Sequence, residues 1–341
     1  MSHIPLFTPY PLRNVTARNR LWISPMCMYS VFAEDGIATD WHLAHYVSRA
    51  VGGAGLIIVE ATAVEPHGRI SARDLGLWDD AQIPALARIA HLMAGCGAVP
   101  AVQLGHAGRK ATVPGAIGPS PLPFSADYAL PQAMAQGEID RVIMAFQQAA
   151  RRALAAGFQA VELHAAHGYL LHQFLSPLSN RRDDQYGGDF DSRIRLTLAV
   201  TAAVRAVWPA ELPLLVRISA TDWAEGGWDL EQSVELARRL AGEEVDLLDV
   251  SSGGLTPAQQ IRLGPGYQVP FAQRIRQETG LATAAVGLIN QAQQANAIVR
   301  DGQADAVLIA RQSLRDPYWP LRAARELGAE LAAPAQYLRG W

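Results

Sequence analysis

The sequence predicts a single α/β domain folded as a (β/α)8 TIM barrel with a long excursion after its third strand. Eight short apolar runs, most of them rich in β-branched residues, recur along the 341 residues. The intervals between them leave room for a helix, and no change of composition marks a second domain. Strands that alternate with helices form a parallel sheet, and eight such units favour a closed barrel over an open doubly wound sheet.

The predicted strands are continuously apolar rather than alternating, as is typical of strands covered on both faces. One helix-sized interval separates the first two predicted strands, and the remaining six strands recur at similar spacing. They cover residues 21–24, 56–60, 99–104, 160–164, 214–218, 247–251, 282–286 and 306–310.

Helix signals fill most of the intervals. In residues 138–156 apolar side chains follow i, i+3, i+4, i+7 spacing, and Gly157 stands where a glycine ends a helix. The pair Asp316 and Pro317 predicts an N-cap and first residue of a helix that ends before Gly328. Further helices are predicted around Leu86, Ile89, Ala90 and Met93, and over 231–241, 270–279 and 290–300.

The longest irregular stretch, residues 105–137, is rich in Pro and Gly and follows the third strand. A loop of this length is typically a functional lid or contains an internal hairpin. We therefore expect it to shape access to whatever site the barrel carries.

Charge and composition exclude several classes of protein. The chain has 29 basic and 32 acidic residues and no basic stripe, which argues against nucleic-acid and anionic-membrane partners. It has no apolar signal-peptide core and no run of 18 apolar residues, so we expect a cytoplasmic protein. Two cysteines, Cys27 and Cys96, are too few for a four-cysteine zinc or iron–sulfur site.

In a TIM barrel the chemistry lies at the carboxyl ends of the strands, and polar residues gather there on six of the eight predicted strands. Gly287 and Arg311 follow the seventh and eighth strands, where barrels commonly hold a phosphate. His164 and His167 follow the fourth strand and have two interpretations. They are either metal ligands with a carboxylate such as Glu162, or hydrogen-bond donors to a substrate oxygen, with Tyr169 as a proton donor.

Three functions therefore stay open from the residues alone: a cofactor-dependent enzyme, a metal-dependent lyase or hydrolase, and a barrel that binds a ligand without turnover. The sequence has no P-loop and no H-E-x-x-H motif, and the segment around Gly53 and Gly55 does not match G-x-G-x-x-G. If the protein uses a nicotinamide cofactor, no dedicated Rossmann domain holds it.

Several motifs resemble the Old Yellow Enzyme family of FMN-dependent ene-reductases, and in particular its bacterial branch with a cysteine near the flavin. The similarity covers essentially the whole chain. With two cysteines and an end at Trp341, we do not expect the iron–sulfur cluster or the C-terminal dinucleotide-binding region that some relatives carry. The motifs, in family order, are residues 24–29, 103–110, 164–170, 179–188, 316–320 and 336–341.

The resemblance implies a tightly but non-covalently bound FMN. Gln103 would bond its pyrimidine edge, Arg217 would stabilise the negative charge of the reduced cofactor, and Cys27 would tune its potential rather than act as a nucleophile. The family often has Gly where this chain has Ala310, a change that requires a negative φ at Ala310. The full set of implied cofactor-binding residues is Ser24, Pro25, Met26, Cys27, Ala61, Gln103, Arg217, Gly287, Ala310 and Arg311.

The resemblance also implies the substrate and its partners. NADPH, with NADH as the alternative, would donate a hydride in a ping-pong cycle that reduces activated alkenes such as α,β-unsaturated carbonyls, nitroalkenes and maleimides. No metal is implied. A homodimer or homotetramer is implied, in which Arg339 of the tail 336–341 reaches a neighbouring subunit. The implied catalytic residues are Tyr169, His164, His167 and Cys27, and the substrate-binding residues are Tyr29, His164, His167, Tyr186 and Arg339.

Overall fold

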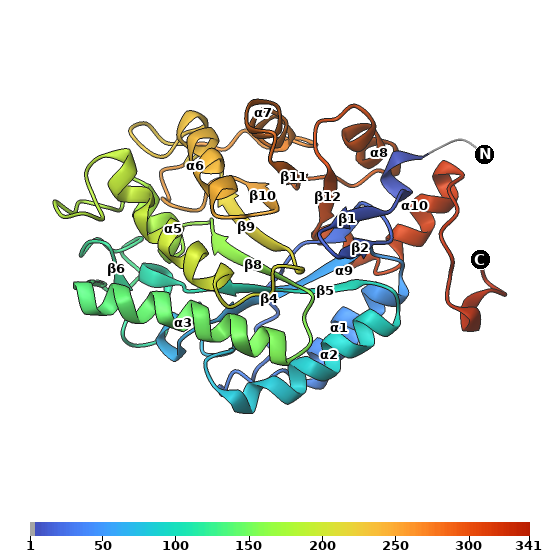
Figure 1. The fold of residues 1–341 in the computed structure, drawn as a ribbon, viewed down its shortest axis with the longest axis horizontal. Coiled ribbons are helices and arrows are strands. Elements are labelled where there is room, and N and C mark those ends of the chain that lie inside the picture. Colours follow the sequence, from blue (N-terminus) through green and yellow to red (C-terminus); the bar gives the residue numbers. More distant parts are fainter. Residues whose placement is uncertain (1–3) are drawn as a thin grey trace.

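The computed structural model describes residues 4–341 as a closed barrel of eight parallel strands surrounded by helices (Figure 1). The barrel closes in the order β10-β11-β12-β3-β4-β5-β8-β9. The predicted (β/α)8 fold is confirmed, and each predicted strand coincides with an observed one. The strands are β3 (Leu21–Ile23), β4 (Leu56–Ala63), β5 (Val99–Gly105), β8 (Ala160–Ala165), β9 (Leu214–Ser219), β10 (Leu247–Ser251), β11 (Ala282–Ala285) and β12 (Ala306–Ile309).

The helices pack around the outside of the barrel, and no helix among residues 4–341 is long and apolar enough to span a membrane. Gly157 and Gly328 both adopt positive φ directly after a helix, as predicted. The helices are α1 (Asp40–Val51), α2 (Ile83–Gly95), α3 (Gln136–Ala155), α4 (Leu170–Leu175), α5 (Phe190–Arg205), α6 (Leu230–Gly242), α7 (Val269–Thr279), α8 (Ala292–Arg300), α9 (Arg311–Arg315) and α10 (Trp319–Leu327).

The predicted start of the last helix was wrong. Asp316 ends the short helix α9, and α10 begins three residues later, with Tyr318 as its N-cap. The Asp316 carboxylate accepts the backbone N–H of Tyr318 at 2.9 Å and an N–H of Arg322, so it braces the turn between the two helices. Pro320, not Pro317, lies in the first turn of α10.

Two small strand pairs lie outside the barrel. The hairpin of β1 (Tyr10–Leu12) and β2 (Val15–Ala17) packs against residues of the barrel interior at its amino end. In the segment 105–137, β6 (Ile117–Gly118) pairs with β7 (Gln132–Ala133) in parallel, so this segment is an excursion pinned by a short ladder and not a hairpin.

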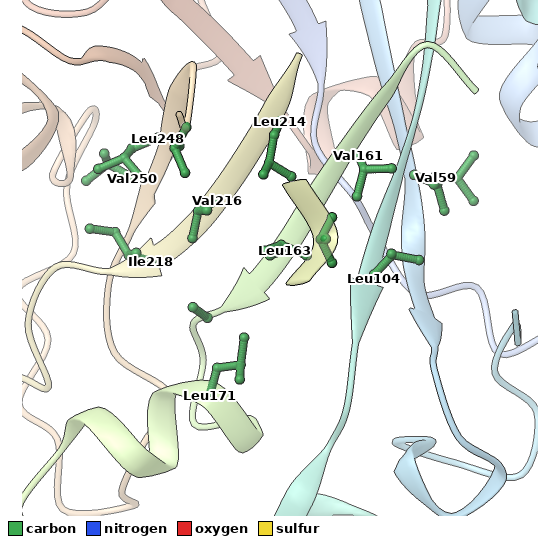
Figure 2. Close-up of a cluster of buried hydrophobic side chains, with 14 of the residues drawn as sticks. Val59, Leu104, Val161, Leu163, Leu171, Leu214, Val216, Ile218, Leu248 and Val250 are labelled. Carbon is green, nitrogen blue, oxygen red and sulfur yellow. The ribbon is translucent and has the colours of Figure 1, made fainter. Parts of the chain in front are cut away.

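The hydrophobic core has two layers. An outer layer lies between strands and helices, and Figure 2 shows Val161, Leu163, Val216 and Leu248 among its side chains. The inner layer fills the amino half of the barrel with the opposite faces of the same strands. It includes Trp22, Leu56, Ile58, Val99, Ala101, Ala160, Leu215, Leu247, Ala284 and Leu308.

Candidate active site

Inward-facing positions change from apolar to polar toward the carboxyl ends of the strands. Side chains two residues apart on a strand share a face, so Glu162 and His164 continue the inward row begun by Ala160. The register pairs His164 with Arg217, and Arg217 with Asp249, which brings these side chains into one belt across the barrel. Parallel pairing thus gathers residues that are far apart in the sequence.

The buried polar side chains of this belt lie in pairs. Nε of Arg217 lies 2.9 Å from Oδ2 of Asp249, and Nε2 of Gln103 donates to Oε1 of Glu162 at 2.8 Å. Burial raises the pKa of both Glu162 and Asp249. The Asp249 carboxylate therefore holds one side of the Arg217 guanidinium group, and the other guanidinium nitrogens are left for a ligand at the mouth of the barrel.

His164, His167 and Tyr169 form a second group beside this belt. The rings of His164 and His167 lie 5.2 Å apart edge to face. Nε2 of His167 lies 2.7 Å from the Ser251 hydroxyl, and the backbone N–H of Ala166 donates to Nδ1 of His164 at 3.3 Å. The neutral His164 ring therefore carries its proton on Nε2.

Burial fixes the protonation states of this group. Burial first, and then the charge of Arg217, lower the pKa of His164 and of His167 well below the usual range. Burial raises the pKa of Tyr169 well above its usual range. Both imidazoles are thus neutral and the phenol keeps its proton, so the group offers N–H and O–H donors without a fixed positive charge.

The segment after β3 forms another wall of the mouth. The backbone N–H of Met28 donates to Oε1 of Glu60 at 2.8 Å, which anchors the segment on β4. Burial, then the carboxylates of Glu60 and Asp74, raise the pKa of the Cys27 thiol, and the Tyr29 side chain is its hydrogen-bond partner. Burial therefore keeps the thiol protonated, and a protonated thiol is a weak nucleophile.

A cavity of about 230 Å³ lies at the ends of β11 and β12, and two guanidinium groups, Arg311 and Arg315, line it. Gly287 has φ of 124°, and a Cβ there would lie 2.8 Å from Nε2 of Gln268. Only glycine therefore lets the backbone at this position lie so close to the Gln268 side chain. Ala310 has φ of −113°, which confirms the conformation that its substitution for glycine requires.

These residues fit FMN. The cavity at β11 and β12 combines two cations with a close-approaching backbone, as phosphate recognition requires. Across the mouth, a small cavity lies between Ala61, His164 and Tyr169. Between these walls, the Ser24 hydroxyl and one Glu162 oxygen are buried without a hydrogen-bond partner in the protein. Orphaned polar atoms of this kind mark a place where a polar ligand makes the missing bonds.

The structure brings most of the predicted site residues to this mouth, at the carboxyl ends of the strands. Two lie elsewhere. Tyr186 is in the hydrophobic core, where its ring meets Phe174 edge to face and its hydroxyl accepts from Gln136 of α3. Arg339 lies in the exposed tail, whose start lines a groove with Cys96 at the opposite end of the barrel.

Sequence reasoning missed two cationic residues of the mouth. Arg315 lies one helical turn after Arg311 on α9 and lines the same cavity, a spacing that the sequence displays. Lys110 donates to the carbonyl oxygens of His167 and Gly254, at 2.9 and 3.1 Å. Burial, followed by the charge of Arg109, lowers the pKa of Lys110 to about 8. Lys110 belongs to the motif of residues 103–110, but the family resemblance implied no role for it.

Comparison with known proteins agrees with this site. The NADH:flavin oxidoreductase / NADH oxidase family model matches residues 5–330. The NADPH dehydrogenase of Geobacillus sp. (strain WCH70) is 52% identical over 337 residues, which cover 98% of each chain. Morphinone reductase superposes with a TM-score of 0.82 at 30% identity, over 98% of this chain and 92% of that chain.

A second structure, morphinone reductase in complex with tetrahydroNAD, superposes with a TM-score of 0.79 at 31% identity, over 96% of this chain and 92% of that one. The family match and the extent of these similarities confirm the resemblance to Old Yellow Enzymes seen in the sequence motifs. The chain is therefore a member of the NADH:flavin oxidoreductase / NADH oxidase family.

Proposed function

We propose that this chain is an FMN-dependent NADPH dehydrogenase that reduces activated C=C bonds in a ping-pong cycle. The observation that carries the proposal is the meeting of two features at one mouth. One is the cavity of Arg311 and Arg315, which suits a phosphate, and the other is the group of neutral donors His164, His167 and Tyr169. The relatives named NADPH dehydrogenase support NADPH as the hydride donor.

Each wall of the mouth has a role in holding the cofactor. Arg311, the backbone at Gly287 and Ala310, and Arg315 would bind the FMN phosphate, while Gln103 and Arg217 would face the polar edge of its ring system. When bound, FMN supplies two-electron chemistry that accepts a hydride from NADPH and passes it on. The segment from Ser24 to Cys27, together with Ala61, would form the remaining contacts with the cofactor.

The donor group would act on the substrate. A hydride added to the β-carbon of an alkene conjugated to a carbonyl or nitro group leaves negative charge on the oxygen of that group. N–H groups of His164 and His167 would stabilise this charge as it develops. The Tyr169 hydroxyl would deliver the proton to the α-carbon and regain one from water, so that the alkene gains one hydride and one proton. Tyr29 would contact the same oxygen.

Oligomerisation and access belong to the proposal as well. The exposed tail supports a homodimer or homotetramer in which Arg339 reaches the mouth of a neighbouring subunit. The excursion 105–137 begins at the end of β5 and carries Lys110 to the mouth, which supports a role as a lid. Both cysteines are free, which is consistent with a cytoplasmic protein.

The experiment that tests the function follows the colour of the purified protein. It should be yellow, lose its colour with NADPH in the absence of oxygen, and regain it with cyclohexenone or a maleimide. Steady-state rates on a panel of enones, nitroalkenes and maleimides, with NADPH and NADH in parallel, would rank the substrates. A colourless protein that does not take up added FMN would contradict the proposal.

A further inference from the structure

A cluster of potential metal ligands lies outside the machinery described above. Glu65 and His67 follow β4, and His106 follows β5, so the pairing of these two strands brings them together from 39 or more residues apart. Among residues 4–341 this is the group of His, Cys, Asp and Glu side chains whose ligand atoms all lie within 4.8 Å of one another. Neither the cofactor nor the substrate contacts proposed above use these three side chains.

The spacing of the ligand atoms suits a tetrahedral cation. Oε2 of Glu65 lies 3.3 Å from Nε2 of His67 and 3.4 Å from Nε2 of His106. In a tetrahedral site with metal–ligand bonds of about 2.0–2.1 Å, neighbouring ligand atoms are roughly 3.3–3.4 Å apart. The two imidazole rings meet at 73°, with 5.4 Å between centroids, so they do not stack on each other.

Burial and missing partners make this a built site. The His106 side chain is fully buried and that of Glu65 is 9% exposed, yet Nε2 of His106 and Oε2 of Glu65 have no hydrogen-bond partner of good geometry. The side chain of His67 is 29% exposed, which leaves an entry path from solvent. Two unpartnered ligand atoms aimed at one point indicate a ligand that completes them.

The neighbours of the cluster orient its ligands. Nε of Arg141 on α3 donates to the other Glu65 oxygen at 2.9 Å, which fixes the carboxylate so that Oε2 faces the two imidazoles. Gly68 lies against the His106 ring, and a Cβ there would be 2.5 Å from Cδ2 of His106. Such outer contacts hold first ligands in place in metal sites.

We propose that Glu65, His67 and His106 bind one divalent cation of the zinc type, with a water as the fourth ligand. Two imidazole nitrogens and a carboxylate oxygen are a ligand set typical of zinc sites with an open position. The cation would join the loop after β4 to the end of β5. His106 also lines the small cavity of His164 and Tyr169, so the cation would stiffen one wall of the active site.

Binding requires a change of tautomer at His106. The backbone N–H of Gly108 donates to Nδ1 of His106 at 3.0 Å, so the neutral ring carries its proton on Nε2, facing Glu65. For Nε2 to bind the cation, this proton moves to Nδ1 and the Gly108 N–H gives up its acceptor, so the ring stays neutral. Losing that hydrogen bond weakens the site relative to a structural zinc site whose ligands are already free.

The test titrates the FMN-loaded enzyme with Zn²⁺ by calorimetry after treatment with EDTA. We expect one zinc per chain. X-ray absorption of the zinc complex should show nitrogen and oxygen neighbours, including two imidazoles. A sulfur neighbour, or the absence of imidazole neighbours, would overturn the assignment.

Variants separate this site from adventitious zinc. H67Q and E65Q should each weaken zinc binding at least ~10-fold, while H91Q, which changes an exposed histidine on α2, should leave it unchanged. His67 is partly exposed, so H67Q is expected to fold, and the flavin spectrum checks that it does. Equal zinc affinity in wild type and H67Q would contradict the proposal. The readout is binding, so it does not depend on which substrate the enzyme reduces.

Discussion

The ring of His164 meets the ring of Tyr169 edge to face, with 4.9 Å between their centroids. His164 ends the inward row of β8 and Tyr169 is the N-cap of α4, so a single turn of chain carries both donors. Burial keeps the imidazole neutral and the phenol protonated. The pair therefore presents two neutral donors, an imidazole N–H and a phenol O–H, side by side.

We predict that Tyr169→Phe separates the two halves of the catalytic cycle. Without the hydroxyl, protonation of the alkene should slow by about 10²- to 10⁴-fold, the usual contribution of a positioned acid. Reduction of the enzyme by NADPH requires no proton from Tyr169 and should keep its rate. Anaerobic stopped-flow absorbance measures both steps. An unchanged rate with the alkene would show that water supplies the proton.

His164→Ala combined with His167→Ala should impair alkene reduction far more than reduction by NADPH, because only the former builds charge on a substrate oxygen. Loss of the donors should cost about 10²- to 10³-fold, as for other oxyanion donors. The same stopped-flow assay applies, with His91→Ala on the exposed face of α2 as the control. Equal losses in both steps would indicate that the histidines hold the cofactor rather than the substrate.

The barrel could be predicted because its strands have a clear signal in the sequence. Continuous apolar runs such as Leu247–Ser251 are buried on both faces, and each predicted run forms a strand of the closed barrel. The helices α1 and α5 were not assigned. Their buried faces include His42 and Arg49 in α1 and Arg193 and Thr197 in α5, so polar residues mask the apolar period that marks a helix.

The site was predictable only as far as strand order determines it. Residues at strand ends, such as Gln103 and Arg217, were placed correctly because all carboxyl ends of a parallel barrel meet at one mouth. Tyr186 follows no strand, and its burial against Phe174 depends on packing that a motif does not encode. The group around Glu65 and His106 depends on strand register and on loop conformation, which sequence spacing does not reveal.

Cys27→Ala should shift the midpoint potential of bound FMN while leaving turnover intact. The thiol is neutral because burial raises its pKa, so the substitution removes a polarisable contact and not a nucleophile. The potential is measured by equilibration with reference dyes. Cys96→Ala is the matched control, because Cys96 lies at the C-terminal end of α2, away from the mouth. Complete inactivity of Cys27→Ala with FMN bound would contradict this role.

Glu60→Gln should change how stability depends on pH. Glu60 is fully buried, and burial raises its pKa from 4.5 to about 7. Its protonated form is favoured on folding, so the stabilisation is full below pH 4.5 and is lost as the pH rises through about 7. The glutamine keeps an acceptor for the Met28 N–H and does not titrate.

Relative to the Glu60→Gln variant, the wild-type protein should therefore lose unfolding free energy as the pH rises from about 4.5 to 7, by up to about 3 kcal/mol. Chemical denaturation of both proteins across this range, with FMN bound, measures the difference. Parallel curves would show that the carboxyl group titrates at its ordinary pKa.

Deletion of residues 336–341 should lower the oligomeric state and raise the KM for the alkene. In one chain the tail exposes the apolar side chains of Tyr337, Leu338 and Trp341, and its anchor is a ring contact of 6.0 Å between Tyr318 and Tyr337. Clustered exposed apolar side chains mark a surface that another chain covers. Light scattering after size exclusion gives the mass, and Arg339→Ala separates assembly from substrate contact, because it should raise KM without changing the mass. Unchanged mass and KM in the deletion would mean that the tail neither joins subunits nor reaches a neighbouring site.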